Sequence, residues 1–247
     1  MERVSCYLAS DIFVVSFGVK KTIVNDRITN KKVNIIHYGS INGLDCEYFS
    51  PQNPNISCIK KNFDFQDNKF VFGYVGRVVS DKGINELVLS FININKTHNN
   101  TKLLLVGPYE ESLDPLHPDT INEINHHPDI IKVDFQNDVR PFYSLIDVFI
   151  FPSFREGFGI SLIEALAMKL PVIASDISGC NEIISHNVNG ILVKKKSIDE
   201  LILAMINLIA DPIKYEKYAN AGRDSVLKKY SQDEVWKKTL KAYKALK

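Results

Sequence analysis

The fold is decided by the stretch VFIFPSFREGFGISLIEALAMKLPVIAS, residues 148–175. It begins with the apolar run Val148 to Phe151, passes through a loop with two glycines, and enters the helical pattern Ile160 to Met168. A second apolar run follows at Val172 to Ala174. Both runs are apolar on both faces, which is typical of parallel strands buried between layers of helices. The stretch therefore predicts a strand, a crossover helix and a second, parallel strand.

The same alternation covers the chain from about Lys69 onward. Further strands are predicted at Phe70 to Val75, Leu103 to Val106, Ile130 to Val133 and Ile191 to Val193. Helical patterns between the strands lie at Ile84 to Ile94, Pro118 to His126, Val139 to Ile146 and, less clearly marked, Cys180 to Ile184. We therefore predict an α/β fold with a doubly wound parallel sheet, which is Rossmann-like.

Shorter pieces flank this unit. Two strand-like runs, Ile12 to Ser16 and Val33 to Ile36, precede it, and helical patterns at Ile198 to Ile209 and Tyr215 to Leu246 follow it. The front piece is too short for a domain of its own and is predicted to be a partial α/β unit. Prolines and a polar stretch before Lys69 indicate a boundary near residue 65.

Composition excludes several classes of protein. The 247 residues carry 30 lysines and arginines against 29 acids, and a net charge of +1 gives no general basic field for nucleic acid. The longest apolar run, Leu201 to Ile206, is far shorter than the roughly 20 residues of a membrane helix. The four cysteines show no metal-ligand spacing and no export signal precedes them, so we expect reduced thiols in a cytoplasmic protein.

The last 36 residues are basic, with ten lysines or arginines against four acids. A solvated pair of amphipathic helices explains this composition. Attraction to anionic lipid headgroups, and hence peripheral contact with the inner face of the cell membrane, is the alternative.

The first loop with polar side chains follows the run Phe70 to Val75. Gly76 allows close approach of the backbone to a ligand, and Arg77 and Lys82 place two cations at the mouth of the sheet. Two such cations suit a diphosphate, since charge-assisted hydrogen bonds contribute about 1.5 to 3 kcal/mol each. Solvated surface cations are the alternative.

The second loop joins Phe151 to a helix that is expected to begin near Gly159 or Ile160. Helix N-termini favour anions, so a phosphate is the expected occupant. Glu156 lies before the helix and Glu164 about one turn inside it, where both carboxylates could accept hydrogen bonds from hydroxyl groups. Glu164 could instead be solvated, but its apolar neighbours indicate a mostly buried helix, in which an acid needs partners.

Other sites are less clearly marked. The loop Ser175 to Gly179 could wrap a substrate or merely turn the chain. A nicotinamide site is disfavoured because Leu162 stands where a third glycine is needed and no acid follows at the required distance. No partner follows His126 and His127 at ligand spacing, so no metal site is predicted.

Taken together, these motifs resemble the donor-binding domain of retaining glycosyltransferases of family 4, which have the two-domain GT-B fold. The resemblance rests on Gly76-Arg77, Lys82-Gly83, Glu156-Gly157-Phe158-Gly159 with Glu164 eight positions after Glu156, and Pro171 to Ser175. It covers nearly the whole chain. It implies a remnant of the acceptor-side N-terminal domain and the crossing at 1–65, a nucleotide-sugar-binding domain at 66–212, and helices at 213–247 packing back toward the N-terminal piece.

The resemblance also implies roles for the site residues. Arg77 and Lys82 would hold the diphosphate, Glu156 the hydroxyls of the transferred sugar, and Glu164 the ribose; Arg77, Lys82 and Glu156 form the catalytic set. The base would lie near residues 135–137, where Gln136 replaces a glycine frequent in relatives. The remaining donor-binding residues would be Gly76, Gly157, Phe158, Gly159 and Ile160. No metal and no other cofactor is expected.

The implied function is transfer of a hexose, with retention, from a nucleotide diphosphate sugar to a glycan or polyprenyl-linked acceptor in bacterial surface polysaccharide biosynthesis. Most of the first domain of the family has no counterpart here, so a truncated, non-catalytic fragment that binds nucleotide sugar is the alternative. An NAD-type oxidoreductase is the third, disfavoured reading.

Overall fold

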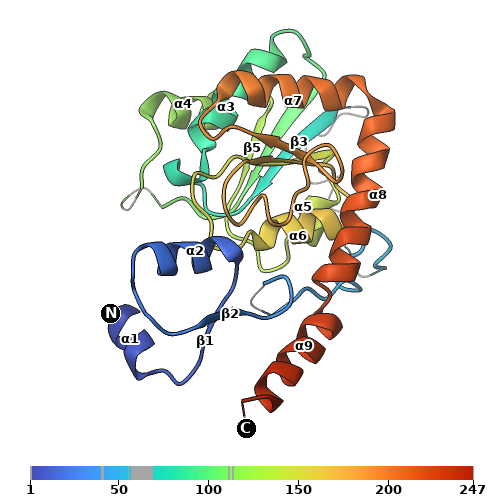
Figure 1. The fold of residues 1–247 in the computed structure, drawn as a ribbon. Helices are drawn as coiled ribbons and strands as arrows, with labels where there is room; N and C mark the ends of the chain where they lie inside the picture. Colours follow the sequence, from blue (N-terminus) through green and yellow to red (C-terminus); the bar gives the residue numbers. More distant parts are fainter. Residues whose placement is uncertain are drawn as a thin grey trace.

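The structure is a computed structural model that describes residues 2–39, 42–54, 56, 69–110, 112 and 114–246 (Figure 1). The expected boundary near residue 65 and Cys58 lie outside these ranges. The other three cysteines are free thiols. Within the described ranges, no helix is both long and apolar enough to cross a membrane.

The main domain is built on a six-stranded sheet with the order β5-β4-β3-β6-β7-β8, in which every neighbouring pair is parallel. Its strands are β3 (Phe70–Val75), β4 (Thr101–Val106), β5 (Ile130–Val133), β6 (Val148–Phe151), β7 (Val172–Ser175) and β8 (Ile191–Val193). From β3 the chain adds β4 and β5 on one side, then crosses back and adds β6, β7 and β8 on the other side. The strand order therefore reverses at β3. This confirms the predicted doubly wound, Rossmann-like α/β fold.

Helices cover both faces of this sheet (Figure 1). One face carries α3 (Ile84–Asn95), α4 (Pro118–His126) and α7 (Ile198–Ala210), and the other carries α5 (Arg140–Tyr143) and α6 (Ile160–Ala167), with α8 (Pro212–Lys229) packed on α6. Because both faces are covered, all six residues of β4 are buried. This double cover explains why the strands read as continuous apolar runs.

Two helical predictions differ from the structure. Instead of the predicted Val139 to Ile146, α5 is a single turn, because Leu145 and Ile146 bond carbonyls only three residues back. The helix predicted at Cys180 to Ile184 is wrong, since that segment forms successive turns after Gly179, which has a φ of +85°. The five residues from Cys180 to Ile184 are too few to form a crossover helix.

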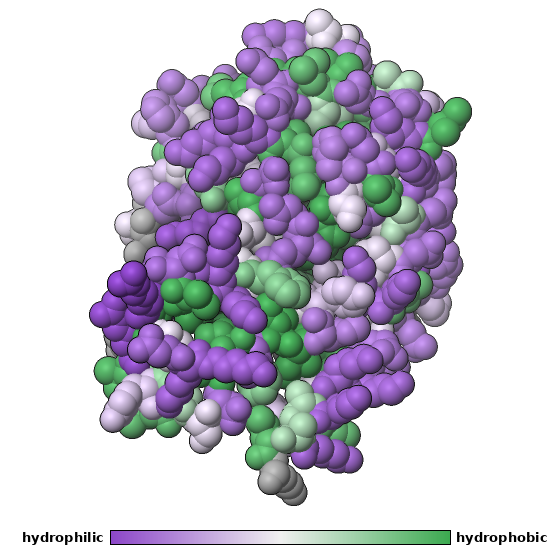
Figure 2. All heavy atoms as spheres, viewed as in Figure 1, coloured by the Kyte–Doolittle hydropathy of each residue, from purple (hydrophilic) through white to green (hydrophobic). Residues whose placement is uncertain are grey.

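The front piece forms its own two-stranded parallel sheet, β1 (Ile12–Val14) with β2 (Val33–Ile35). Its helices are α1 (Glu2–Leu8) and α2 (Phe17–Asn25), and the last helix, α9 (Gln232–Lys244), lies beside it. The rings of Phe13 and Tyr243 meet edge to face, with centroids 6.2 Å apart. Tyr7 and Leu8 of α1 and Phe17 of α2 are exposed. Apolar side chains are also visible among polar ones on the lower part of the molecule (Figure 2).

Hydrogen bonds fix the front piece against the main domain. The Glu182 carboxylate, in the segment after β7, accepts from the backbone N–H groups of Phe17 (2.7 Å) and Gly18 (2.8 Å) at the start of α2. The crossing segment is held at Leu44, whose N–H donates to the Tyr230 carbonyl at 2.8 Å. The Arg223 guanidinium also donates to carbonyls of the crossing and of α6. These contacts place α2 opposite the carboxyl ends of β6 and β7.

Candidate functional site

The candidate site lies where three neighbouring strands end. In the sheet β3, β6 and β7 are adjacent, so the loops after Val75, Phe151 and Ser175 emerge at one edge. Ligands of open α/β sheets bind at this edge. The sheet order thus brings together the three loops that the sequence marked.

The first two loops press against each other at Gly83. Its φ is +72°, and a Cβ there would lie 2.2 Å from the Pro152 carbonyl oxygen. The Phe154 N–H also donates to the Asp81 carbonyl at 2.9 Å. Only glycine allows this approach of the two backbones, and the approach sets the distance between the cation of one loop and the carboxylate of the other.

Lys82 and Glu156 form an ion pair across these loops. Their side chains are only 15% and 12% exposed, so the charges are largely withdrawn from water. The Ser153 hydroxyl, fully buried, donates to the same Glu156 oxygen, Oε1, at 3.1 Å. Glu156 is therefore held by one cation and one hydroxyl.

Arg77 has a different partner. Its Nη1 donates to Oε2 of Glu110 at 2.7 Å, and this hydrogen bond is the main cause that raises the pKa of Arg77. The two side chains are 47% and 30% exposed, so the pair is accessible to a ligand. The buried Tyr74 hydroxyl donates to the Arg77 carbonyl at 2.9 Å and so fixes the backbone that carries the guanidinium.

The second loop leads into α6, which begins at Ile160 as expected. Gly159 is its N-cap and provides no side-chain hydrogen bond. Phe158 is buried against the Tyr230 ring, with centroids 5.6 Å apart, whereas Ile160 is 44% exposed. Phe158 and the N-cap Gly159 are thus buried, and Ile160, the first residue of the helix, is exposed.

Glu164 is partly buried within α6 rather than solvated. The Tyr143 hydroxyl of α5 donates to its Oε2 at 2.8 Å. Burial raises the pKa of the Glu164 carboxyl, and the bond from Tyr143 partly offsets that effect. The sequence argument that an acid here needs a partner is confirmed, and the partner is a phenol rather than a cation.

The third loop forms one wall of a cleft of about 840 Å³ between the main domain and the front piece. Asp176 to Ser178 line it beside Glu156 and Gly157, and apolar side chains of β1 and α2, such as Val14, line the opposite wall. Gly179 packs against the Glu156 backbone, where a Cβ would come within 2.9 Å of its carbonyl oxygen. The loop both turns the chain and shapes the cleft.

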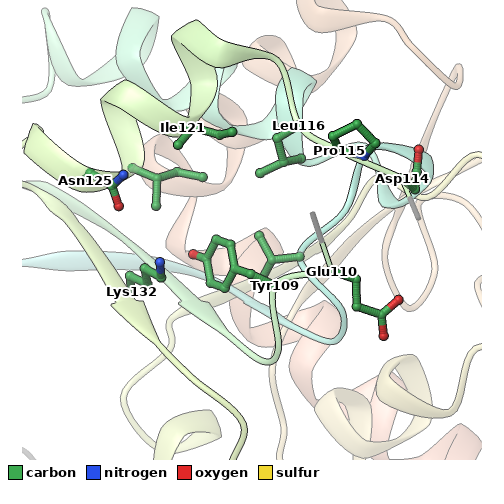
Figure 3. Close-up of a pocket in the computed structure, with 10 residues that line it drawn as sticks. Tyr109, Glu110, Asp114, Pro115, Leu116, Ile121, Asn125 and Lys132 are labelled. Atoms are coloured by element: carbon green, nitrogen blue, oxygen red, sulfur yellow. The ribbon is translucent and has the colours of Figure 1, made fainter. Parts of the chain in front are cut away.

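The segment expected near the base is more loosely held. Gln136 donates from Nε2 to the Asp134 carbonyl at 3.3 Å, and Phe135 is 66% exposed. A separate cavity of about 30 Å³, room for roughly one water molecule, lies between α4 and the loop after β4. Tyr109 and Lys132 lie side by side along it (Figure 3).

Three residues that complete these contacts were not singled out from the sequence: Ser153, Tyr143 and Glu110. Ser153 and Tyr143 each have apolar neighbours in the sequence, and polar groups need partners when buried, so this signal was available. Glu110 carried no such signal. Among the residues that the structure describes, no group of three or more metal-ligating side chains forms a cluster.

Comparison with known proteins decides the family. The family model "Glycosyl transferases group 1" matches residues 56–225, more than half of the chain. The chain belongs to this family. We therefore interpret the candidate site as that of a group 1 glycosyl transferase. Its charged residues are Arg77, Lys82, Glu156 and Glu164.

The relatives point the same way. The chain is 31% identical to the capsular polysaccharide biosynthesis glycosyltransferase CapM of Staphylococcus aureus, over 98% of this chain and 63% of CapM. It is 28% identical to the UDP-Gal:alpha-D-GlcNAc-diphosphoundecaprenol alpha-1,3-galactosyltransferase of Escherichia coli, over 70% of this chain and 45% of that enzyme. The chain thus spans less than two thirds of the length of these relatives.

Solved structures share the fold. HepE of Anabaena, crystallised with UDP, superposes with a TM-score of 0.84 at 18% identity, over 98% of this chain and 65% of HepE. At this identity the likeness concerns the fold. The six-stranded domain together with the front piece is therefore an arrangement that HepE also has.

Proposed function

We propose that this chain binds a nucleotide diphosphate sugar and forms the donor side of a retaining glycosyltransferase of family 4. The observation that carries the proposal is the meeting of Lys82 and Glu156 at the carboxyl edge of the sheet, with Arg77 and Glu164 on neighbouring elements. Two cations and two carboxylates at one edge match the phosphates and the hydroxyls of such a donor.

Each group has a role in this proposal. Arg77 and Lys82 bind the diphosphate and stabilise the negative charge that develops on the leaving nucleotide. Glu156 accepts hydrogen bonds from the transferred hexose, and Glu164 from the ribose. The backbone N–H groups of Phe158 to Ile160, at the entry to α6, add hydrogen bonds to phosphate and sugar. We propose that these cations do this work without a divalent metal, so a chelator should leave donor binding unchanged.

The acceptor side is proposed from the relatives. CapM and the E. coli galactosyltransferase are named for capsule synthesis and for a diphosphoundecaprenol-linked acceptor. A glycan or polyprenyl-linked acceptor is therefore proposed for the whole protein, with transfer on the cytoplasmic side of the membrane. The exposed Trp236, Leu240 and Tyr243 of the lysine-rich α9 favour peripheral contact with anionic lipid there.

Arg77→Ala tests donor binding. In calorimetric titrations with UDP, GDP and ADP, we expect the wild-type chain to bind one of them. The variant should bind it about ten- to 150-fold more weakly, because a charge-assisted contact worth roughly 1.5 to 3 kcal/mol is lost. Arg3→Ala, which removes an exposed arginine of the front piece, is the matched control. Absence of binding to folded wild-type chain would contradict the proposal.

Glu110→Gln should act in the opposite direction. Glu110 forms an ion pair with the Arg77 guanidinium, so a diphosphate must compete with this carboxylate. Because the pair is half-exposed and worth at most about 1 kcal/mol, we expect the variant to bind the nucleotide about three- to fivefold more tightly. The same titration measures it, with Glu216→Gln as control. Weaker binding would instead show that Glu110 orients Arg77 for the ligand.

Binding and transfer are separate questions. Because the chain spans about 63% of CapM, a module that binds nucleotide sugar without transferring it is the second candidate function. Release of UDP from UDP-glucose in the presence of a lipid-linked acceptor would favour the enzyme. Tight nucleotide binding with no release would favour the binding module.

A further inference from the structure

The two glutamates of the site are held in similar ways. Each has one carboxylate oxygen engaged by a buried hydroxyl, Ser153 for Glu156 and Tyr143 for Glu164. Glu156 also forms an ion pair with Lys82, whereas within the described residues the carboxylate of Glu164 is bonded by the Tyr143 phenol alone. We propose that Tyr143 is a positioning residue that presents Glu164 to the ribose hydroxyls of the donor nucleotide; this inference rests on the proposed function.

Tyr143 is suited to this role because it is fixed. Its side chain is fully buried, and its ring packs on those of Phe149 (centroids 5.7 Å apart) and Phe49 (6.4 Å). Its hydroxyl lies 2.8 Å from Oε2 of Glu164 and 3.4 Å from the Ser161 carbonyl. Because other rings contact the Tyr143 ring on two sides, its side chain cannot rotate freely. The Tyr143 hydroxyl therefore stays at a defined point beside α6.

The geometry leaves Glu164 able to accept further hydrogen bonds. A carboxylate has about four lone-pair sites, and the Tyr143 hydroxyl occupies one of them. Within the described ranges, Oε1 of Glu164 takes part in no hydrogen bond. Adjacent hydroxyls, as in the 2′,3′-diol of a ribose, can then donate to a carboxylate whose orientation is already set, which lowers the entropic cost of binding.

Among the residues that the structure describes, no ion pair or hydrogen bond joins the Glu164 carboxylate to a charged side chain. The nearest element on the other side is α8, where the Arg223 guanidinium donates to the carbonyls of Ala167 and Phe49. Burial raises the pKa of the Glu164 carboxyl, and the Tyr143 hydrogen bond lowers it. Loss of the hydroxyl should therefore raise the pKa further, so that the ionised acceptor is lost at a higher pH.

The experiment compares UDP with 2′,3′-dideoxy-UDP on wild type and Tyr143→Phe, by calorimetry between pH 5 and 8. We expect the variant to bind UDP about three- to tenfold more weakly at pH 8 and the dideoxy ligand less than about twofold more weakly. The pH at which UDP binding is half lost should move upward. Tyr218→Phe, which removes a 2.9 Å hydroxyl bond to Asn187 away from the site, is the matched control.

The outcomes separate the two proposals. Loss confined to UDP, together with the shifted pH midpoint, supports positioning, because a merely structural role would weaken both ligands equally and leave the midpoint unchanged. Equal weakening of both ligands, or unchanged binding, would overturn it while the proposed function stands. If folded wild type binds no UDP, GDP or ADP, the proposed function and this inference fall together.

Discussion

Replacing Lys82 with alanine is expected to lower the free energy of unfolding by about 3 kcal/mol, because removal of one partner from a buried ion pair leaves the other charge uncompensated. Lys82 and Glu156 are 15% and 12% exposed, and the remaining Ser153 hydroxyl cannot neutralise a carboxylate. Urea denaturation of wild type and variant, read by circular dichroism, measures the difference.

A second pair of variants separates the ion pair from simple loss of packing. The double variant Lys82→Met/Glu156→Gln removes both charges and keeps the volume of the side chains, so we expect it to regain much of the stability that Lys82→Ala loses. Lys237→Ala, which breaks a 3.9 Å pair with Glu234 that is 76% and 41% exposed, should change stability by less than about 0.5 kcal/mol. Equal effects of Lys82→Ala and Lys237→Ala would show that the site pair is solvated.

Much of the fold was predictable from local pattern. Four of the six main strands were bounded as predicted, among them Phe70–Val75 and Val148–Phe151, because burial on both faces requires an unbroken apolar run. Pattern failed for Cys180 to Ile184, where a few apolar residues fit either a helix or a series of turns. Gly179, in the left-handed region, and the Glu156 backbone packed against it decide between them.

The candidate site was predictable in its residues but not in its pairing. Glycines and charges after the strands marked Arg77, Lys82, Glu156 and Glu164. The sequence did not show that Lys82 would pair with Glu156, 74 positions away, or that Arg77 would take a different carboxylate. Those partners depend on strand order, since β3 and β6 are neighbours only because the chain crosses over β4 and β5 between them.

Strand order alone still leaves the loops free to separate, and the close approach at Gly83 holds them together. Gly83→Ala should lower the free energy of unfolding by about 3 kcal/mol or more, because an L-residue in the left-handed region costs roughly 1 to 2 kcal/mol and overpacking adds about 1 to 3. The new Cβ would meet the Pro152 carbonyl oxygen at 2.2 Å, and backbone atoms on both sides must move to relieve it.

The same substitution at Gly157 provides the comparison. There the nearest side-chain atom would lie 3.9 Å from the added Cβ, so denaturation should show a change within about 0.5 kcal/mol. Gly83→Ala should also separate Lys82 from Glu156, so its loss should shrink in the Lys82→Met/Glu156→Gln background, where no charge is left to be exposed or stranded. If Gly83→Ala costs no more than Gly157→Ala, the two loops do not approach as closely as this and the site is not held by their contact.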